Sequence, residues 1–143
     1  MDEIYHQALK LLRRRDYSVR QIRMKLSEKF GDVPSEIIRQ LIEKRFLDDR
    51  RFAENVVLKS GDRHPSRVRE ELAGAGVSEE TADSAIALKD WPSLQSVLKA
   101  KMNSLRLRAP LHRREASRLF RILSRLGYEE DEIREELKRL HDE

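Results

Sequence analysis

The stretch LAGAGVSEETADSAI, residues 72–86, has the same pattern as LSRLGYEEDEIREEL, residues 123–137, which lies 51 positions later. In both copies a leucine stands four residues before a glycine, and apolar or aromatic residues follow that glycine at one, six and ten positions. A looser third copy, with two extra residues in its turn, comprises Leu26, Gly31, Val33, Ile38 and Ile42. A repeat of this kind predicts an array of small units, each too small to bury a core alone.

The composition favours helices over strands. Among the 143 residues, 39% are charged, 38% are hydrophobic and only 6% are aromatic, whereas an all-β chain needs more aromatic and β-branched residues. The chain contains no cysteine, which excludes disulfides, thiolate metal sites and a cysteine nucleophile. No apolar stretch is long enough to cross a membrane, and the first ten residues lack the apolar core of a signal peptide. We therefore expect a soluble cytoplasmic protein.

Apolar periodicity and capping residues predict an all-α fold of nine helices in three triplets. Ser18 with Gln21 forms a capping-box signature, and Asp48 and Ser78 are the expected N-caps of later helices. Gly31 is expected to end its helix in the left-handed conformation. The three-helix repeats are predicted to cover residues 1–47, 48–90 and 91–143. The helices are expected at about residues 2–14, 19–30, 34–44, 49–57, 66–75, 79–86, 94–105, 116–126 and 129–140.

The net charge of +4 conceals a segregation of charge along the chain. Residues 10–25 carry seven basic residues and one acid, and residues 99–125 carry nine basic residues and one acid. Residues 48–90, in contrast, carry seven basic and ten acidic residues. Basic blocks on both sides of an acidic centre indicate that the ends of the array contact a polyanion.

Four arginines of the second block recur at intervals of four, three and four residues, which places them on one helix face opposite the apolar side chains. A solvated face with ion pairs inside the helix is the ordinary alternative, but Glu115 is the only acid nearby. We therefore favour contact with an anion, above all phosphate, which guanidinium groups bind bidentately and with little sequence specificity. The candidate residues of both blocks are Arg13, Arg14, Arg15, Arg20, Arg23, Lys25, Lys99, Lys101, Arg106, Arg108, Arg113, Arg114, Arg118, Arg121 and Arg125.

Nothing in the sequence predicts catalysis. The four histidines, at positions 6, 64, 112 and 141, do not pair at a metal-ligand spacing. No phosphate-binding glycine loop and no hydrolase motif occurs. Neighbouring acids such as Asp48 and Asp49 point about 100° apart on a helix, so they do not converge on one atom. We expect no catalytic residue, no metal site and no cofactor.

Two triplets contain a helix–turn–helix spacing, which raises the alternative of a protein that reads DNA sequence. Such a protein needs polar, base-reading side chains at the start of the helix that enters the major groove. The third helices begin instead with acids, at Glu36, Glu79 and Glu129, which repel phosphate. The triplets are therefore predicted to be interaction modules. The large aromatic residues are predicted to pack rather than to stack on bases, and they are Tyr5, Tyr17, Trp91 and Tyr128.

Four motifs, spread in order over nearly the whole chain, resemble the RecX family of bacterial regulatory proteins. The most specific is FLDDRRFA at residues 46–53, and the others are ALKLLRRRDYS at 8–18, RVREELAGAGV at 67–77 and the segment 123–137. In the motif FLDDRRFA, Asp48 is the expected N-cap, and Asp49 suits the positive end of the helix dipole. Its apolar residues, Phe46, Leu47 and Phe52, are predicted to pack between repeats.

The resemblance implies an elongated, curved array of three tandem three-helix repeats that acts, without enzymatic activity, as a negative regulator of the recombinase RecA. It implies binding in the groove of the RecA–DNA filament, with less filament growth, ATP hydrolysis, strand exchange and co-protease activity. We expect a monomer whose partners are the RecA filament and single- and double-stranded DNA of any sequence. Two alternatives stay open: a stand-alone, salt-sensitive DNA-binding protein, and a helical adaptor for another acidic partner.

Overall fold

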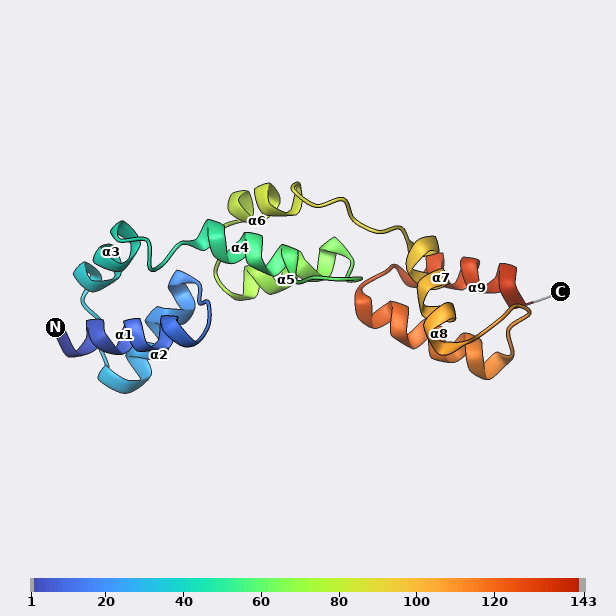
Figure 1. Cartoon of the computed structure of the whole chain (residues 1–143), viewed down its shortest axis with the longest axis horizontal. Helices are drawn as coiled ribbons and strands as arrows, with labels where there is room; N and C mark the ends of the chain where they lie inside the picture. Colours follow the sequence, from blue (N-terminus) through green and yellow to red (C-terminus); the bar gives the residue numbers. More distant parts are fainter. Residues whose placement is uncertain (1, 142–143) are drawn as a thin grey trace. The chain divides into compact units, whose positions relative to one another are not determined.

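The structure, a computed structural model, describes residues 2–141, and every regular element in this range is an α-helix (Figure 1). The predicted all-α class is therefore confirmed. The helices of the described chain are α1 (Asp2–Arg14), α2 (Val19–Phe30), α3 (Ser35–Glu43), α4 (Asp49–Leu58), α5 (Pro65–Gly74), α6 (Glu79–Ile86), α7 (Leu94–Leu105), α8 (Arg113–Leu126) and α9 (Glu130–His141).

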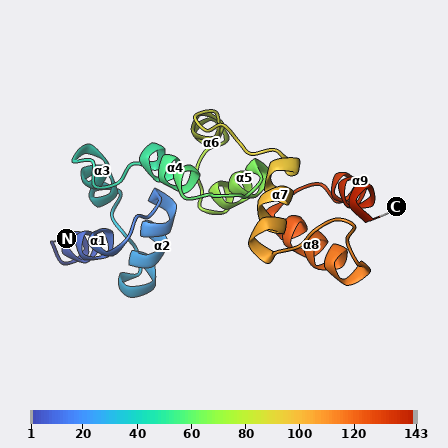
Figure 2. The same ribbon diagram turned by 45° about the vertical axis from the view of Figure 1, so that its right-hand side comes forward.

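The described chain forms two compact units. The first runs to Lys59 and resumes over Arg69–Lys89, so it contains α1 to α4, most of α5, and α6. The second comprises Ser60–Val68 and the chain from Asp90 onward, which supplies the start of α5 together with α7, α8 and α9. In the first unit α2 packs on α1 and α6 packs on α4, whereas in the second unit α8 packs on both α7 and α9 (Figures 1 and 2).

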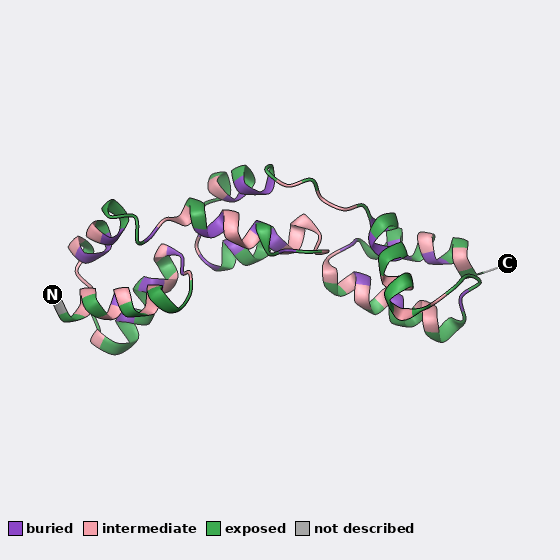
Figure 3. Ribbon diagram, viewed as in Figure 1, coloured by how far each residue is buried: buried purple, intermediate pink, exposed green. Residues whose placement is uncertain are grey.

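The apolar and aromatic residues that define the second and third copies of the repeat are all buried (Figure 3). The leucines that precede the three glycines, Leu26, Leu72 and Leu123, are all fully buried. Fully burying such a leucine contributes about 1.5–3 kcal/mol, so each triplet gains its stability largely from this shared pattern. The core of α7 to α9 comprises Leu94, Val97, Leu98, Leu111, Leu119, Leu123, Tyr128, Ile133 and Leu137.

The register assigned to the first copy of the repeat is wrong. Ile42 is 45% exposed, whereas Leu41 is fully buried and Ile37 is 1% exposed. Ile37 and Leu41 lie six and ten residues after Gly31, the same spacing as the core residues of the other two copies. The first copy therefore contains one extra residue, between Leu26 and Gly31, rather than two. Two adjacent pairs of candidates, Ile37 with Ile38 and Leu41 with Ile42, hide this choice in the sequence, because either member of a pair fits a helical period.

Side chains close the helix ends largely as predicted. Ser18 and Gln21 form the capping box, with the Gln21 N–H donating to Ser18 Oγ at 3.2 Å and the Ser18 N–H donating to Gln21 Oε1 at 3.0 Å. Asp48 caps α4 and Ser78 caps α6, as expected. Gly31 differs, because its φ of +76° and ψ of −126° lie outside the left-handed helical region. Glycine alone adopts such a conformation at little cost.

The start of α2 is bound to the second triplet by contacts that span long stretches of sequence. The buried Ser18 hydroxyl donates to the Ala75 carbonyl at 2.6 Å. Asp49 Oδ1 accepts the Val19 N–H at 2.8 Å, so Asp49 satisfies an otherwise unpaired donor at the N-terminus of another helix. The FLDDRRFA motif thus links the first two triplets through the hydrogen bond that Asp49 accepts.

Two of the three apolar residues of this motif are buried. Leu47 and Phe52 are buried, at 1% and 5% exposure. Phe46, in contrast, is 43% exposed, so the prediction that it packs between repeats is wrong. The chain reverses immediately before it, at Arg45 with φ of +64°, and the following residue, Leu47, enters the core in its place.

Two arginines make the same kind of contact with two of the repeat glycines. The Arg20 side chain lies against Gly76, and the Arg67 side chain lies against Gly127, both glycines having positive φ, at +82° and +101°. A Cβ at these glycines would stand 2.7 Å from Arg20 Cδ and 2.4 Å from Arg67 Cγ. Each arginine also donates to a carbonyl shortly before its glycine, at 2.8 and 3.4 Å. The repeat therefore requires glycine both for the turn and for the close approach of the arginine.

Gly76→Ala is expected to lower the free energy of unfolding by about 2 kcal/mol, because alanine is strained at positive φ and its Cβ displaces Arg20. Gly74→Ala is the matched control two residues away, in a helical position with open space around it. There alanine should stabilise the protein by about 0.4–1 kcal/mol. Urea unfolding followed by far-UV circular dichroism measures both changes, and a shift of both variants in the same direction would contradict the role assigned to Gly76.

Candidate functional site

The arginine row predicted from the sequence lies on α8, which is held in place at both its start and its middle. The His112 N–H donates to Glu115 Oε1 at 2.9 Å, and this contact caps the N-terminus of the helix. Leu119 and Leu123 are fully buried against α7 and α9. This apolar face fixes the rotation of α8, so the opposite face is fixed toward solvent.

That opposite face carries an uncompensated positive charge. All four arginines of the row, at 114, 118, 121 and 125, are exposed, and neither they nor Arg113 form an ion pair within residues 2–141. Glu115, the nearby acid, is engaged at the start of the helix. At 1.5 Å per residue the row is about 16 Å long. A shallow hollow beside it is lined by His112, Arg113, Arg114, Ser117 and Arg121.

The other basic residues of the second block are less uniform. Lys101 forms an ion pair with Asp62, with a distance of 3.2 Å between Nζ and Oδ2. Arg106 ends α7 in the left-handed conformation, with φ of +58°. Lys99 and Arg108 are exposed and have no ion pair in the described part of the chain. Of the exposed cations of this block that have no ion pair among the described residues, five lie on α8 and three, at positions 99, 106 and 108, lie outside it.

The N-terminal basic block is partly occupied by contacts inside the first unit. The Arg15 guanidinium lies 4.7 Å from the centre of the Tyr17 ring, and Arg15 Nε donates to the Asp16 carbonyl at 3.3 Å. Arg20 donates to the Gly74 carbonyl, as described above. Its remaining members are exposed and have no ion pair within the described residues, and they are Arg13, Arg14, Arg23 and Lys25.

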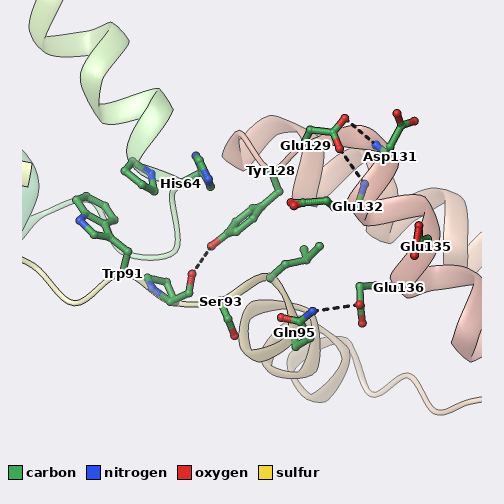
Figure 4. Close-up of a pocket in the computed structure, with 13 residues that line it drawn as sticks. His64, Trp91, Ser93, Gln95, Tyr128, Glu129, Asp131, Glu132, Glu135 and Glu136 are labelled. Carbon is green, nitrogen blue, oxygen red and sulfur yellow. Dashed lines mark hydrogen bonds between the residues drawn. The ribbon is translucent and has the colours of Figure 1, made fainter.

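The second unit also contains a pocket that the sequence analysis did not predict (Figure 4). Its volume is about 570 Å³. Tyr128 lies in the middle of it, with Trp91 and His64 on one side and carboxylates of α9 on the other. No local pattern predicts this pocket, because nothing in the sequence places residues 64 and 91 beside the acids of α9. The pocket is lined by His64, Pro65, Trp91, Pro92, Ser93, Leu94, Gln95, Tyr128, Glu129, Asp131, Glu132, Glu135 and Glu136.

Tyr128 holds the pocket together and is 6% exposed. Its hydroxyl donates to the Pro92 carbonyl at 3.1 Å, and its ring meets the His64 ring edge to face at 5.2 Å between centres. Burial, and then the nearby Asp62 carboxylate, raise the pKa of the Tyr128 hydroxyl above its ordinary value of 10.0. The neutral hydroxyl is thus favoured in the folded state. Its contribution to stability is complete below pH 10 and is lost as the pH rises through the raised pKa.

The described residues contain no group of three or more histidine or acidic side chains placed to hold a metal ion. None of their helices is both long enough and apolar enough to span a lipid bilayer. The surface of the second unit carries two features of opposite charge, the arginine face of α8 and the acidic, aromatic pocket.

Comparison with known proteins shows what the chain is similar to. A protein named Regulatory protein RecX from Halorhodospira halophila is 32% identical over 133 residues, which cover 89% of this chain and 81% of that protein. The protein of the same name from Chromohalobacter salexigens is 31% identical, with 89% and 86% covered. The chain belongs to the RecX family. A third RecX protein, from Thermus thermophilus, is 31% identical, with 85% and 80% covered. No protein-family model matches the chain.

Solved structures of RecX proteins share this fold. RecX from Lactobacillus salivarius matches with a TM-score of 0.67 at 20% identity, and the match covers 96% of both chains. A second RecX crystal structure matches with a TM-score of 0.63 at 21% identity, covering 96% of this chain and 71% of the other. The resemblance predicted from FLDDRRFA and the repeat is therefore confirmed in sequence, and the helical array is confirmed in structure.

Proposed function

We propose that this protein is a non-enzymatic negative regulator of the recombinase RecA. In this proposal it acts as a monomer, binds in the groove of the RecA–DNA filament, and limits filament growth, ATP hydrolysis, strand exchange and co-protease activity. The observation that carries the proposal is that the chain belongs to the RecX family. The match to the protein named Regulatory protein RecX from Halorhodospira halophila covers 89% of this chain. Function is assigned by the family here, because helical repeats by themselves host many functions.

The surface of the second unit supports a partner that combines nucleic acid with protein. The arginine face of α8 offers four exposed guanidinium groups without carboxylate partners among the described residues, which suits a row of phosphates. We propose that this face contacts DNA in the filament with low sequence specificity. The unpaired cations of the N-terminal block, at positions 13, 14, 23 and 25, are proposed as a second, weaker contact.

The α8 face by itself also favours a second candidate, a stand-alone DNA-binding protein. The starts of the third helices argue against sequence reading, since α3, α6 and α9 all carry acids in their first turn, where phosphate would approach. A stand-alone binder would act on DNA in the absence of RecA, with affinity that falls steeply as salt rises. The third candidate, an adaptor for another acidic protein, would use the same arginines without nucleic acid.

The RecA ATPase on single-stranded DNA separates these candidates. The regulator should lower the rate of ATP hydrolysis by about half or more when it is substoichiometric to RecA, because blocking a growing filament affects many protomers. In the control, the same amount of protein is added to the DNA before RecA, and the DNA is in large excess. Under these conditions the protein cannot inhibit RecA merely by occupying the sites on DNA. If inhibition disappears in DNA excess, the stand-alone DNA-binding function is the correct one.

A further inference from the structure

The pocket around Trp91, called the Trp91 pocket from here on, plays no part in the DNA contact proposed for α8. It lies entirely within the second unit, and its walls come from three separate segments: residues 64–65, residues 91–95 and residues 128–136 (Figure 4). Hydrogen bonds fix these segments to one another, with the His64 N–H donating to the Leu126 carbonyl at 2.8 Å and the Tyr128 hydroxyl donating to the Pro92 carbonyl at 3.1 Å. The pocket is therefore preformed.

One wall of the pocket carries negative charge that the protein does not balance. Two of its carboxylates have cationic partners on α9, Asp131 with Arg134 and Glu136 with Arg139. The carboxylates of Glu132 and Glu135 have no hydrogen-bond or ion-pair partner within residues 2–141. Among the described residues, no lysine or arginine lines the pocket. A cation brought from outside would therefore meet carboxylates that have not yet been neutralised.

Aromatic rings complete the pocket: Tyr128 lies in its middle, with the ring of His64 edge to face against it, and Trp91 lies on the side away from the acids (Figure 4). Aromatic faces attract cations, and the flat guanidinium group stacks on indole while it donates to carboxylates. The volume of about 570 Å³ is that of a pocket for a small ligand, which accommodates a long side chain together with its flanking backbone. A metal ion does not fit, since the described acids form no group of three placed to coordinate one. Phosphate does not fit either, because the wall is acidic.

We propose that the Trp91 pocket receives an arginine side chain of a protein partner. In this proposal the second unit has two binding surfaces of opposite charge: the basic face of α8 contacts phosphate, and the acidic Trp91 pocket contacts a basic segment of polypeptide. The proposal deepens and rests on the proposed function, because it names the chemistry by which the protein component of the filament is held.

Trp91 is the only tryptophan of the chain, so its fluorescence reports directly on the pocket. We expect a blocked tri-arginine peptide, titrated into the whole protein at low salt, to change the Trp91 emission saturably, and a tri-glutamate peptide to leave it unchanged. The double variant Glu132→Gln/Glu135→Gln removes the two unpaired carboxylates, and it should weaken the peptide about tenfold. Both side chains are exposed, so the variant should keep the circular dichroism of the parent.

The matched control is Glu79→Gln/Glu80→Gln, which removes two exposed acids from the first turn of α6 outside the pocket. It should bind the peptide as the parent does. Equal weakening in both double variants would show that the peptide senses net charge alone, and an emission that does not change with the peptide would show that no arginine enters the pocket. Either result overturns the proposal.

The RecA ATPase then separates this proposal from the proposed function. If the parent protein inhibits RecA and the variant at Glu132 and Glu135 inhibits equally well, the pocket is not the docking site and the regulatory function stands. If the peptide binds as expected and the parent does not inhibit RecA, the pocket stands and the regulatory function fails. If inhibition of RecA is about tenfold weaker in the variant at Glu132 and Glu135 but unchanged in the variant at Glu79 and Glu80, the result would support both the pocket proposal and the regulatory function.

Discussion

A chain carrying Arg114→Glu, Arg118→Glu and Arg121→Glu is expected to bind single-stranded DNA about 100-fold more weakly than its parent at moderate salt. Each of these arginines is exposed and has no ion pair within the described residues, so each is available to neutralise a phosphate. Removing three phosphate contacts should also make the plot of log affinity against log salt concentration shallower by about 2 units for single-stranded DNA. Titration of labelled DNA at several salt concentrations, read by fluorescence anisotropy, measures both quantities.

A variant with the same change in net charge controls for this experiment. Lys44→Glu, Lys59→Glu and Lys138→Glu alter exposed lysines outside the α8 face: the first two directly follow α3 and α4, and the third lies on α9. This variant should lose far less affinity and keep the salt dependence of the parent. If the two variants weaken DNA binding equally, the interaction depends on overall charge, and the assignment of the α8 face is wrong.

Leu123→Ala is expected to lower the free energy of unfolding of the second unit by about 2–5 kcal/mol. Leu123 is fully buried in the core of α7 to α9, and truncating it leaves a cavity there. The loss is comparable to the whole stability of many small domains. Urea unfolding followed by the fluorescence of Trp91 reports on this unit specifically, because the only tryptophan of the chain lies in it.

The control at the same site is Leu123→Met, which conserves most of the volume and should cost less than about 1.5 kcal/mol. The difference between alanine and methionine isolates the effect of the cavity from the effect of changing the residue. Similar and small losses for both would mean that Leu123 is not at the centre of a packed core. They would also weaken the interpretation of the repeat, in which the leucine before each glycine anchors its triplet.

Much of the fold could be predicted because the repeat and the capping residues are local signals. Ser18 with Gln21, and Asp48 three residues before Arg51, specify helix starts through neighbours in sequence. The choice between Leu41 and Ile42 could not be made in this way, since both fit a helical period and only packing buries one of them. The donation from Ser18 to Ala75 spans 57 residues, so no local pattern could reveal it.

The candidate surfaces also differ in whether local sequence predicts them. The α8 row was predicted from spacing alone, because one helix contains all of its arginines. The structure adds that Arg20 and Lys101 are held by partners on other segments, which removes them from the freely available charge. The Trp91 pocket escaped prediction because three distant segments build it. An aromatic residue next to proline at Trp91, together with the acid-rich start of α9, was the one signal that the sequence contained.

The rate of ATP hydrolysis by RecA on single-stranded DNA is the measurement on which the proposed function most directly depends. With this protein present at a level well below that of RecA, the rate should fall by about half or more, and it should fall further as the protein is added. A rate that stays unchanged at a saturating excess of the protein would contradict the assignment of a negative regulator.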